Sequence, residues 1–198
     1  MKKITSFVTM KHKIKSIGLL ILIFFQKILD QAYSLIRGIP TGRISQVTAH
    51  LFLGGQYDLQ GLKKLKEMGI TGIINMRVHS IYKETQYEGF HYLHLPTVDN
   101  TAPSLEDLVK GAEFAGDEIK NGGKVYIHCR QGLGRGPTMA IAYLMKMGAT
   151  YEDAFATVKA ARTFISPRPV QIQRLKELEI WFREHDATIK EVIPTAIS

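Results

Sequence analysis

The stretch that most constrains the fold is residues 128–135, which read His-Cys-Arg-Gln-Gly-Leu-Gly-Arg. A short apolar segment, residues 124–127, leads into it, and a helix-forming run, residues 138–147, follows it. These patterns predict a cysteine at the end of a strand, on a glycine-bearing loop that continues into the N-terminus of a helix. Backbone N–H groups and the positive end of a helix dipole meet at such a place. The stretch therefore predicts an anion-binding loop.

Two side chains give this loop its chemistry. N–H donors and positive potential favour the thiolate form of Cys129, which is the nucleophilic form of a cysteine. Arg135 follows six residues later, and its guanidinium can bind two oxygens of one anion at the same time. A nucleophile, an anion-binding loop and a bidentate cation together indicate attack on a phosphate monoester. The alternative interpretation is a buried cysteine in an ordinary strand–helix turn.

The motif His-Cys-x5-Arg resembles the phosphate-binding loop of the cysteine-based protein tyrosine phosphatases, and the glycine three residues after the cysteine fits as well. The resemblance is closest to the compact dual-specificity branch and covers roughly residues 43–185. It implies that Cys129 is the nucleophile and that His128 orients the cysteine and the loop. The residues that it assigns to phosphate binding are Arg130, Gln131, Gly132, Leu133, Gly134 and Arg135.

One position departs from the family pattern. The family usually has serine or threonine directly after the arginine, where the hydroxyl helps the thiolate to leave when the phosphoenzyme is hydrolysed. In this sequence Gly136 stands there, followed by Pro137 and Thr138. Pro137 suits the first turn of a helix, because its missing N–H would have no partner there. We therefore hypothesise that Thr138 partly replaces the missing hydroxyl, or that breakdown of the intermediate is slow.

The leaving oxygen needs a proton, which a carboxylic acid on a neighbouring loop can supply. The resemblance implies an aspartate some 30 residues before the cysteine, and Asp99 stands at that position. Asp99 follows a predicted strand and precedes a predicted helix, so a loop is natural there. Glu106 and Asp107 are nearby carboxylates, but their pattern is that of a first helical turn. The competing interpretation of Asp99 is an ordinary surface aspartate.

Strand-like and helix-like segments alternate after residue 43, which predicts an α/β fold with a mainly parallel central sheet covered by helices. The expected strands lie in 44–52 (a short pair), 70–76, 90–95 (ended by Pro96) and 124–127. The expected helices span residues 58–68, 104–120, 138–147, 150–161 and 170–184. This gives three parts: an N-terminal extension over 1–42, a catalytic domain over 43–185 and a tail over 186–198.

The N-terminal extension is basic and partly apolar. The chain of 198 residues has a net charge of +8, and residues 1–40 supply +6 of it, with seven lysines and arginines against one acid. Because the excess charge sits outside the catalytic domain, it is no indication of a nucleic-acid partner. The apolar run 17–25 is nine residues long, whereas a bilayer span needs about 20. Apolar positions within 14–36 instead share one helical face, which favours an amphipathic helix at a membrane surface. A secretory signal or signal anchor, and a helix packed on the domain, are the alternatives.

The single cysteine allows no disulfide within the sequence, and a free thiol suits a reducing compartment. We therefore expect a cytoplasmic protein at the inner face of a membrane. The expected activity is hydrolysis of phosphotyrosine, phosphoserine and phosphothreonine in proteins through a cysteinyl-phosphate. No cofactor and no metal ion are expected, since the resemblance implies chemistry without metal and no cluster of cysteine and histidine has ligand spacing.

Two other functions stay open. Residues 51–56, 75–77 and 96–101 resemble the dual-specificity subgroup that dephosphorylates phosphatidylglycerophosphate, and a membrane-lying helix would suit a lipid head group. The substrate would then be a membrane phospholipid, either phosphatidylglycerophosphate or a phosphoinositide. The second alternative is a non-catalytic module that binds phosphorylated ligands, and Gly136 is the feature that favours it.

Overall fold

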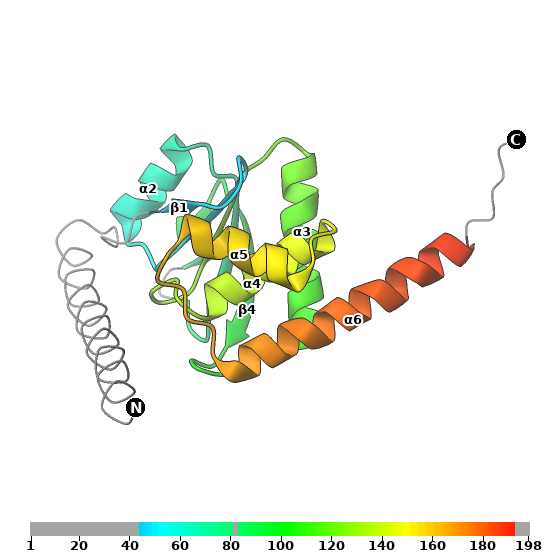
Figure 1. Cartoon of the computed structure of the whole chain (residues 1–198). Coiled ribbons are helices and arrows are strands. Elements are labelled where there is room, and N and C mark those ends of the chain that lie inside the picture. Colours follow the sequence, from blue (N-terminus) through cyan, green and yellow to red (C-terminus); the bar gives the residue numbers. More distant parts are fainter. Residues whose placement is uncertain (1–43, 81–82, 193–198) are drawn as a thin grey trace, which may run out of the picture.

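The computed structural model describes residues 44–80 and 83–192 (Figure 1). The helix expected over 14–36 and the rest of the N-terminal extension lie outside the described residues. The described part contains a sheet of five strands: β1 Ser45–Gln46, β2 Leu51–Gly54, β3 Gly72–Arg77, β4 His91–Thr97 and β5 Val125–His128. Their order across the sheet is β1-β2-β5-β3-β4.

The sheet is mainly parallel, as predicted. Only β1 runs antiparallel, against β2, and the other neighbouring strands pair in parallel. On the central strand β5, Ile127 pairs with Leu53 on one side and with Ile74 on the other. Because the parallel strands are in register, their carboxyl ends meet at one edge of the sheet, where α/β folds bind ligands. Cys129 follows the central strand at this edge.

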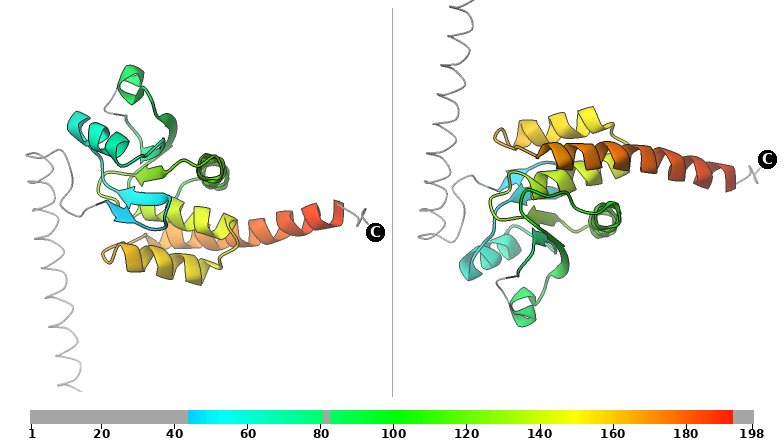
Figure 2. Two further views of the ribbon diagram at one scale, coloured as in Figure 1. Left: turned by 90° about the horizontal axis from the view of Figure 1, so that it is seen from above. Right: turned by 90° about the horizontal axis from the view of Figure 1, so that it is seen from below.

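Helices cover both faces of the sheet. They are α2 Leu59–Glu67, the short 3-10 helix η1 Glu84–Tyr87, α3 Leu105–Lys120, α4 Arg135–Lys146, α5 Tyr151–Ala161 and α6 Pro169–Val192. One buried cluster joins the sheet to α3, α4, α5 and α6, and a second cluster joins its other face to α2. Figures 1 and 2 show α2 on the opposite side of the sheet from α4, α5 and α6.

The central strand shows why the sequence produces this layered arrangement. Val125 and Ile127 belong to the cluster under α3–α6, whereas Tyr126 between them belongs to the cluster under α2. All three side chains are fully buried. A strand that is covered on both faces has no polar side, so it reads as a continuous apolar run instead of an alternating one.

Three predicted helix starts are confirmed. Asp58, Ser104 and Thr150 are the N-cap residues of α2, α3 and α5, and each side-chain oxygen accepts a hydrogen bond from a backbone N–H in the first helical turn. Such caps satisfy N–H groups that have no partner inside the helix. The polar residue before each apolar run therefore located these helices to within one residue.

The prediction that the strand over 90–95 ends at Pro96 is wrong. Strand β4 runs on through Pro96 to Thr97. The reason is its place in the sheet: β4 is an edge strand, and proline is tolerated at an edge because its missing N–H breaks no ladder hydrogen bond on the open side.

The last helix is longer than predicted, since α6 continues past Glu184 to Val192. No glycine or proline occurs between residues 170 and 193, so nothing in this segment interrupts the helical backbone. None of the helices in the described ranges combines the length and the apolar composition needed to cross a membrane.

Candidate active site

The loop of residues 129–135, called the phosphate loop from here on, joins the central strand β5 to the N-terminus of α4. Cys129 is buried at its start, with 3% of its surface exposed. The Gly132 N–H donates a hydrogen bond to Cys129 Sγ over 3.2 Å. Gly132 has a φ of 68°, a left-handed conformation that favours glycine. The structure thus brings the thiol, an N–H donor and a helix start together.

Arg162, directly after α5, holds the outer side of the phosphate loop. Its Nε donates to the Gly132 carbonyl over 2.8 Å, and one terminal nitrogen donates to the Gln131 carbonyl over 2.9 Å. The C=O and N–H of one planar peptide point in opposite directions. Drawing the Gln131 carbonyl outward therefore turns the Gly132 N–H inward, toward Cys129. Sequence reasoning did not single out Arg162.

Two backbone N–H groups hold the neighbouring carbonyls of the phosphate loop. Gln56, after β2, donates its N–H to the Arg130 carbonyl over 3.1 Å, and Ser166, after α5, donates to the Leu133 carbonyl over 2.6 Å. Four consecutive loop carbonyls are therefore bound from outside by segments far apart in the sequence. This arrangement leaves the loop with a fixed inner surface of N–H groups, the geometry expected of an oxyanion site.

Arg135 lies under the same edge of the sheet and is 5% exposed. One terminal nitrogen donates to the carbonyl oxygens of Thr97, over 2.8 Å, and Met76, over 3.4 Å. The other forms an ion pair with Asp99 Oδ1 at 3.0 Å. Within the part of the chain that the structure describes, the buried Nε of Arg135 has no hydrogen-bond partner. Because buried N–H groups are almost always paired, this one fits a ligand oxygen.

Asp99 lies on the loop between β4 and α3. Residues 98–101 of this loop, called the acid loop from here on, make a tight turn in which the Thr101 N–H and hydroxyl both donate to the Val98 carbonyl, over 3.2 and 2.9 Å. The Asp99 side chain is 66% exposed and contacts the solvent on one side and Arg135 on the other. Its carboxyl group therefore lies beside the guanidinium that would hold a phosphoryl group.

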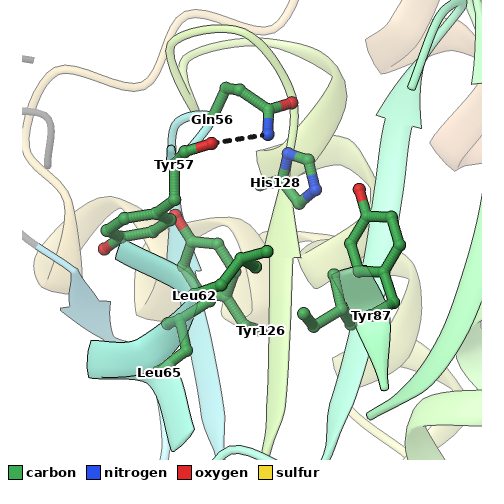
Figure 3. A pocket seen from close by; sticks show the side chains of 8 residues that line it. Gln56, Tyr57, Leu62, Leu65, Tyr87, Tyr126 and His128 are labelled. Atoms are coloured by element: carbon green, nitrogen blue, oxygen red, sulfur yellow. Dashed lines mark hydrogen bonds between the residues drawn. The ribbon is translucent and has the colours of Figure 1, made fainter. Parts of the chain in front are cut away.

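His128, the last residue of β5, is buried beside the pocket drawn in Figure 3. Its Nδ1 lies 3.4 Å from the Cys129 carbonyl oxygen, and its ring stacks on Tyr126 with centroids 5.8 Å apart. His128 and Gln56 line this pocket together with aromatic and aliphatic side chains: Tyr57, Leu62, Leu65, Ile73, Tyr87 and Tyr126. The pKa of His128 is lowered from 6.5 to about 4, chiefly by burial and also by the charges of Arg77 and His94, while the hydrogen bond with the Cys129 backbone acts in the opposite direction. A neutral imidazole bonded to the loop backbone suits the orienting role expected from the sequence.

Positions 136 and 138, which the sequence analysis considered for a hydroxyl near the thiol, have different neighbours. The Thr138 hydroxyl donates to the Gly134 carbonyl over 3.0 Å, one turn back in the helix. A Cβ added at Gly136 would lie 3.7 Å from Cys129 Sγ. Position 136 is therefore the place from which a hydroxyl would reach the sulfur, while the hydroxyl of Thr138 is bonded elsewhere.

The other carboxylates considered from the sequence lie apart from this chemistry. Glu106 and Asp107 occupy the first turn of α3, as expected, and the Asp107 N–H is bound by the Ser104 cap. Across the described ranges, no group of three or more histidine, cysteine, aspartate or glutamate side chains is arranged to hold a metal ion.

Comparison with known proteins identifies the family of the chain. The family model "Dual specificity phosphatase, catalytic domain" matches residues 51–180. Human dual specificity protein phosphatase 1 is 33% identical over 125 residues, which make up 62% of this chain and 33% of that protein. The chain thus spans about a third of the length of the curated relatives that it matches first.

Solved structures resemble the chain over most of their own length. The crystal structure of PTPMT1 is 27% identical, has a TM-score of 0.69, and is matched over 74% of this chain and 99% of that one. The crystal structure of PTPMT1 in complex with PI(5)P is 28% identical, with a TM-score of 0.66, over 71% of this chain and 96% of that one. The sheet order, the phosphate loop and the matched family model lead to one conclusion: this chain belongs to the dual-specificity phosphatase family, in the compact branch of the cysteine-based protein tyrosine phosphatases.

Proposed function

We propose that this protein hydrolyses phosphate monoesters on phosphotyrosine, phosphoserine and phosphothreonine residues of proteins, through a cysteinyl-phosphate intermediate. The observation that carries the proposal is Arg135, a buried cation whose Nε has no partner among the described residues and whose neighbour is Asp99. A guanidinium held in this way offers two N–H groups to one phosphoryl group, next to a cysteine and a carboxyl group. The family of the chain supports the same reaction.

In the first step, the Cys129 thiolate attacks phosphorus, so an S–P bond forms while the P–O bond to the leaving group breaks. The inward N–H groups of the phosphate loop and the guanidinium of Arg135 bind the equatorial oxygens, where negative charge is spread in the transition state. Binding of the phosphoryl group takes over the Arg135 nitrogen that now contacts Asp99. Asp99, in its protonated form, then gives its proton to the leaving oxygen.

In the second step, water attacks phosphorus and the S–P bond breaks. The Asp99 carboxylate, left by the first step, removes a proton from the water. The sulfur leaves as a thiolate, which the Gly132 N–H stabilises at 3.2 Å. Because Gly136 offers no hydroxyl at this point, the leaving sulfur has one donor fewer than the family pattern provides.

A second candidate function is hydrolysis of a membrane phospholipid. The favouring observation is the likeness to PTPMT1, whose structure in complex with PI(5)P is matched over nearly its whole length. Val98, the residue before Asp99, is 60% exposed, so an apolar side chain stands at the rim beside the proposed acid. In this case the basic residues 1–40 would bind anionic lipid and hold the domain at the inner face of a membrane.

The test is phosphate release in the presence of a chelator, with Cys129→Ser and Asp99→Asn alongside the wild type. Turnover that Cys129→Ser abolishes, and that Asp99→Asn slows by about 10²–10⁴-fold, is the expected result. Comparing a phosphotyrosine peptide with vesicles that carry phosphatidylglycerophosphate then separates the two substrate classes. Folded wild-type protein that binds inorganic phosphate but turns over neither substrate would instead identify a non-catalytic module.

A further inference from the structure

We propose that Gln171, near the start of α6, is a positioning residue that fixes the acid loop against the phosphate loop. The inference rests on the proposed function, since it assigns a partner to Asp99 as general acid. The Asp99 side chain is mostly exposed, and among the described residues it forms an ion pair with Arg135, whose guanidinium must turn to the substrate. The position of its carboxyl group must therefore be set by the residues around it.

Gln171 contacts both loops from a buried position. It is 1% exposed, and its Nε2 donates to the Thr101 carbonyl of the acid loop over 2.8 Å. Its Oε1 accepts the Arg168 N–H over 2.8 Å. A Cβ built on Gly134 of the phosphate loop would lie 3.2 Å from the same Oε1, so the amide packs against that loop as well. One side chain thus joins the two catalytic loops to the start of α6.

Arg168, the residue before α6, makes a second connection to the acid loop, at the residue directly after Asp99. Its Nε donates to Asn100 Oδ1 over 2.8 Å. Asn100 has a φ of 66°, a left-handed conformation that is uncommon for residues other than glycine. The two residues that directly follow Asp99 are therefore both held from the start of α6. Arg168 binds the side chain of Asn100, and Gln171 binds the carbonyl of Thr101. This directs the preceding carboxyl group toward Arg135.

The consequence is selective. A displacement of about 1 Å at a catalytic group can lower the rate by about 10²-fold. A displaced general acid slows the reactions of poor leaving groups, which need a proton, and leaves good leaving groups almost unaffected. A glutamine with a merely structural role would instead affect both kinds of substrate alike.

The experiment uses the full chain and two aryl phosphates, phenyl phosphate and dinitrophenyl phosphate, which have a poor and a good leaving group. Gln171→Glu keeps the acceptor for the Arg168 N–H and places an oxygen against the Thr101 carbonyl. Gln171→Leu removes both bonds. The matched control is Gln173→Leu, the same change at an exposed position of the same helix. Each variant is also made in the Asp99→Asn background, and kcat/KM is measured across pH.

We expect Gln171→Glu to lower kcat/KM for phenyl phosphate by about 10–100-fold and for dinitrophenyl phosphate by less than about 3-fold. With phenyl phosphate, the decline of kcat/KM at high pH should be smaller in Gln171→Glu than in the wild type. The loss of kcat/KM that Gln171→Glu causes should vanish in the Asp99→Asn background. Equal losses with both substrates, or a full additional loss on top of Asp99→Asn, would overturn the inference. If the Gln171 variants do not fold, Arg168→Met at its exposed position must show the same selectivity.

The proposed function and the role of Gln171 would be overturned by different results. An Asp99→Asn variant without leaving-group selectivity would remove Asp99 as general acid, and with it both the proposed function and this inference. Selectivity in Asp99→Asn that is absent from Gln171→Glu, Gln171→Leu and Arg168→Met would overturn only the inference.

Discussion

Replacing Gly136 by serine should speed the breakdown of the cysteinyl-phosphate. A Cβ at this position lies 3.7 Å from Cys129 Sγ and 3.6 Å from the Cys129 N, so a hydroxyl one bond further can reach the sulfur. The tightest contact of the new Cβ is Leu53 Cδ1 at 3.0 Å. That atom is the end of an aliphatic side chain, and a shift of a few tenths of an ångström would accommodate the Cβ.

The size of the effect follows from the charge on the leaving sulfur. A hydrogen bond to a charged group contributes about 1.5–3 kcal/mol, which corresponds to about 10–100-fold in the rate of the second step. In a rapid-quench experiment with an activated aryl phosphate, the wild type should show a burst of phenol release, because the intermediate accumulates. Gly136→Ser should reduce the burst and raise the steady-state rate.

Gly136→Ala is the matched control, because it adds the same Cβ without the hydroxyl. The reasoning would be refuted by a wild type without a burst whose steady-state rate the serine leaves unchanged. It would also be refuted if Gly136→Ala accelerated the steady state as much as Gly136→Ser, since the hydroxyl would then have no part in the effect.

Three further predictions concern residues around the thiol. Because burial lowers the pKa of His128 to about 4, the unfolded chain binds more protons than the folded chain between that value and 6.5. The free energy of unfolding should thus fall by about 2 kcal/mol from about pH 7.5 to about pH 5. In urea titrations, this pH-dependent loss of stability should be missing in His128→Gln and present in the control His79→Gln, a change at an exposed position. Arg162→Met should weaken inhibition by vanadate by about 10–100-fold, because the phosphate loop loses two charge-assisted hydrogen bonds; an unchanged inhibition constant would contradict this. Gly132→Ala should abolish turnover and lower stability in thermal unfolding by more than Gly122→Ala does. Both glycines have positive φ, which costs an alanine about 1–3 kcal/mol of strain, but of the two only the Cβ at Gly132 would clash with a backbone oxygen, that of Gly54.

Much of the fold could be predicted from the sequence, because its elements depend on local patterns. The N-caps at Asp58, Ser104 and Thr150 satisfy N–H groups within their own helical turn, so the sequence alone locates them. The apolar run before Cys129 predicted a strand, and β5 is found there with side chains buried on both of its faces. The place of the phosphate loop between a strand and a helix was predictable for the same reason, since Cys129 and Arg135 lie six residues apart in one continuous segment.

The parts that escaped prediction depend on contacts between distant segments. Arg162 binds a carbonyl 30 residues earlier, and Gln171 binds one 70 residues earlier. In the sequence, both are ordinary polar residues at helix ends, and only the packing of α5 and α6 on α4 brings them to the loops. The predicted strand end at Pro96 was wrong for a related reason, because a proline is tolerated in a strand only where that strand lies at the edge of the sheet.

The buried thiol of Cys129, the proposed nucleophile, also decides how the site responds to oxidation. A thiolate stabilised by N–H donors is the form that peroxide converts to a sulfenic acid. Many thiols recover from that state by forming a disulfide with a neighbouring cysteine, but Cys129 has no second cysteine in this sequence. Recovery must then come from a thiol outside this sequence, or from a bond between the oxidised sulfur and a backbone nitrogen of the loop. In the absence of either, further oxidation to the sulfinic acid would remove the nucleophile irreversibly.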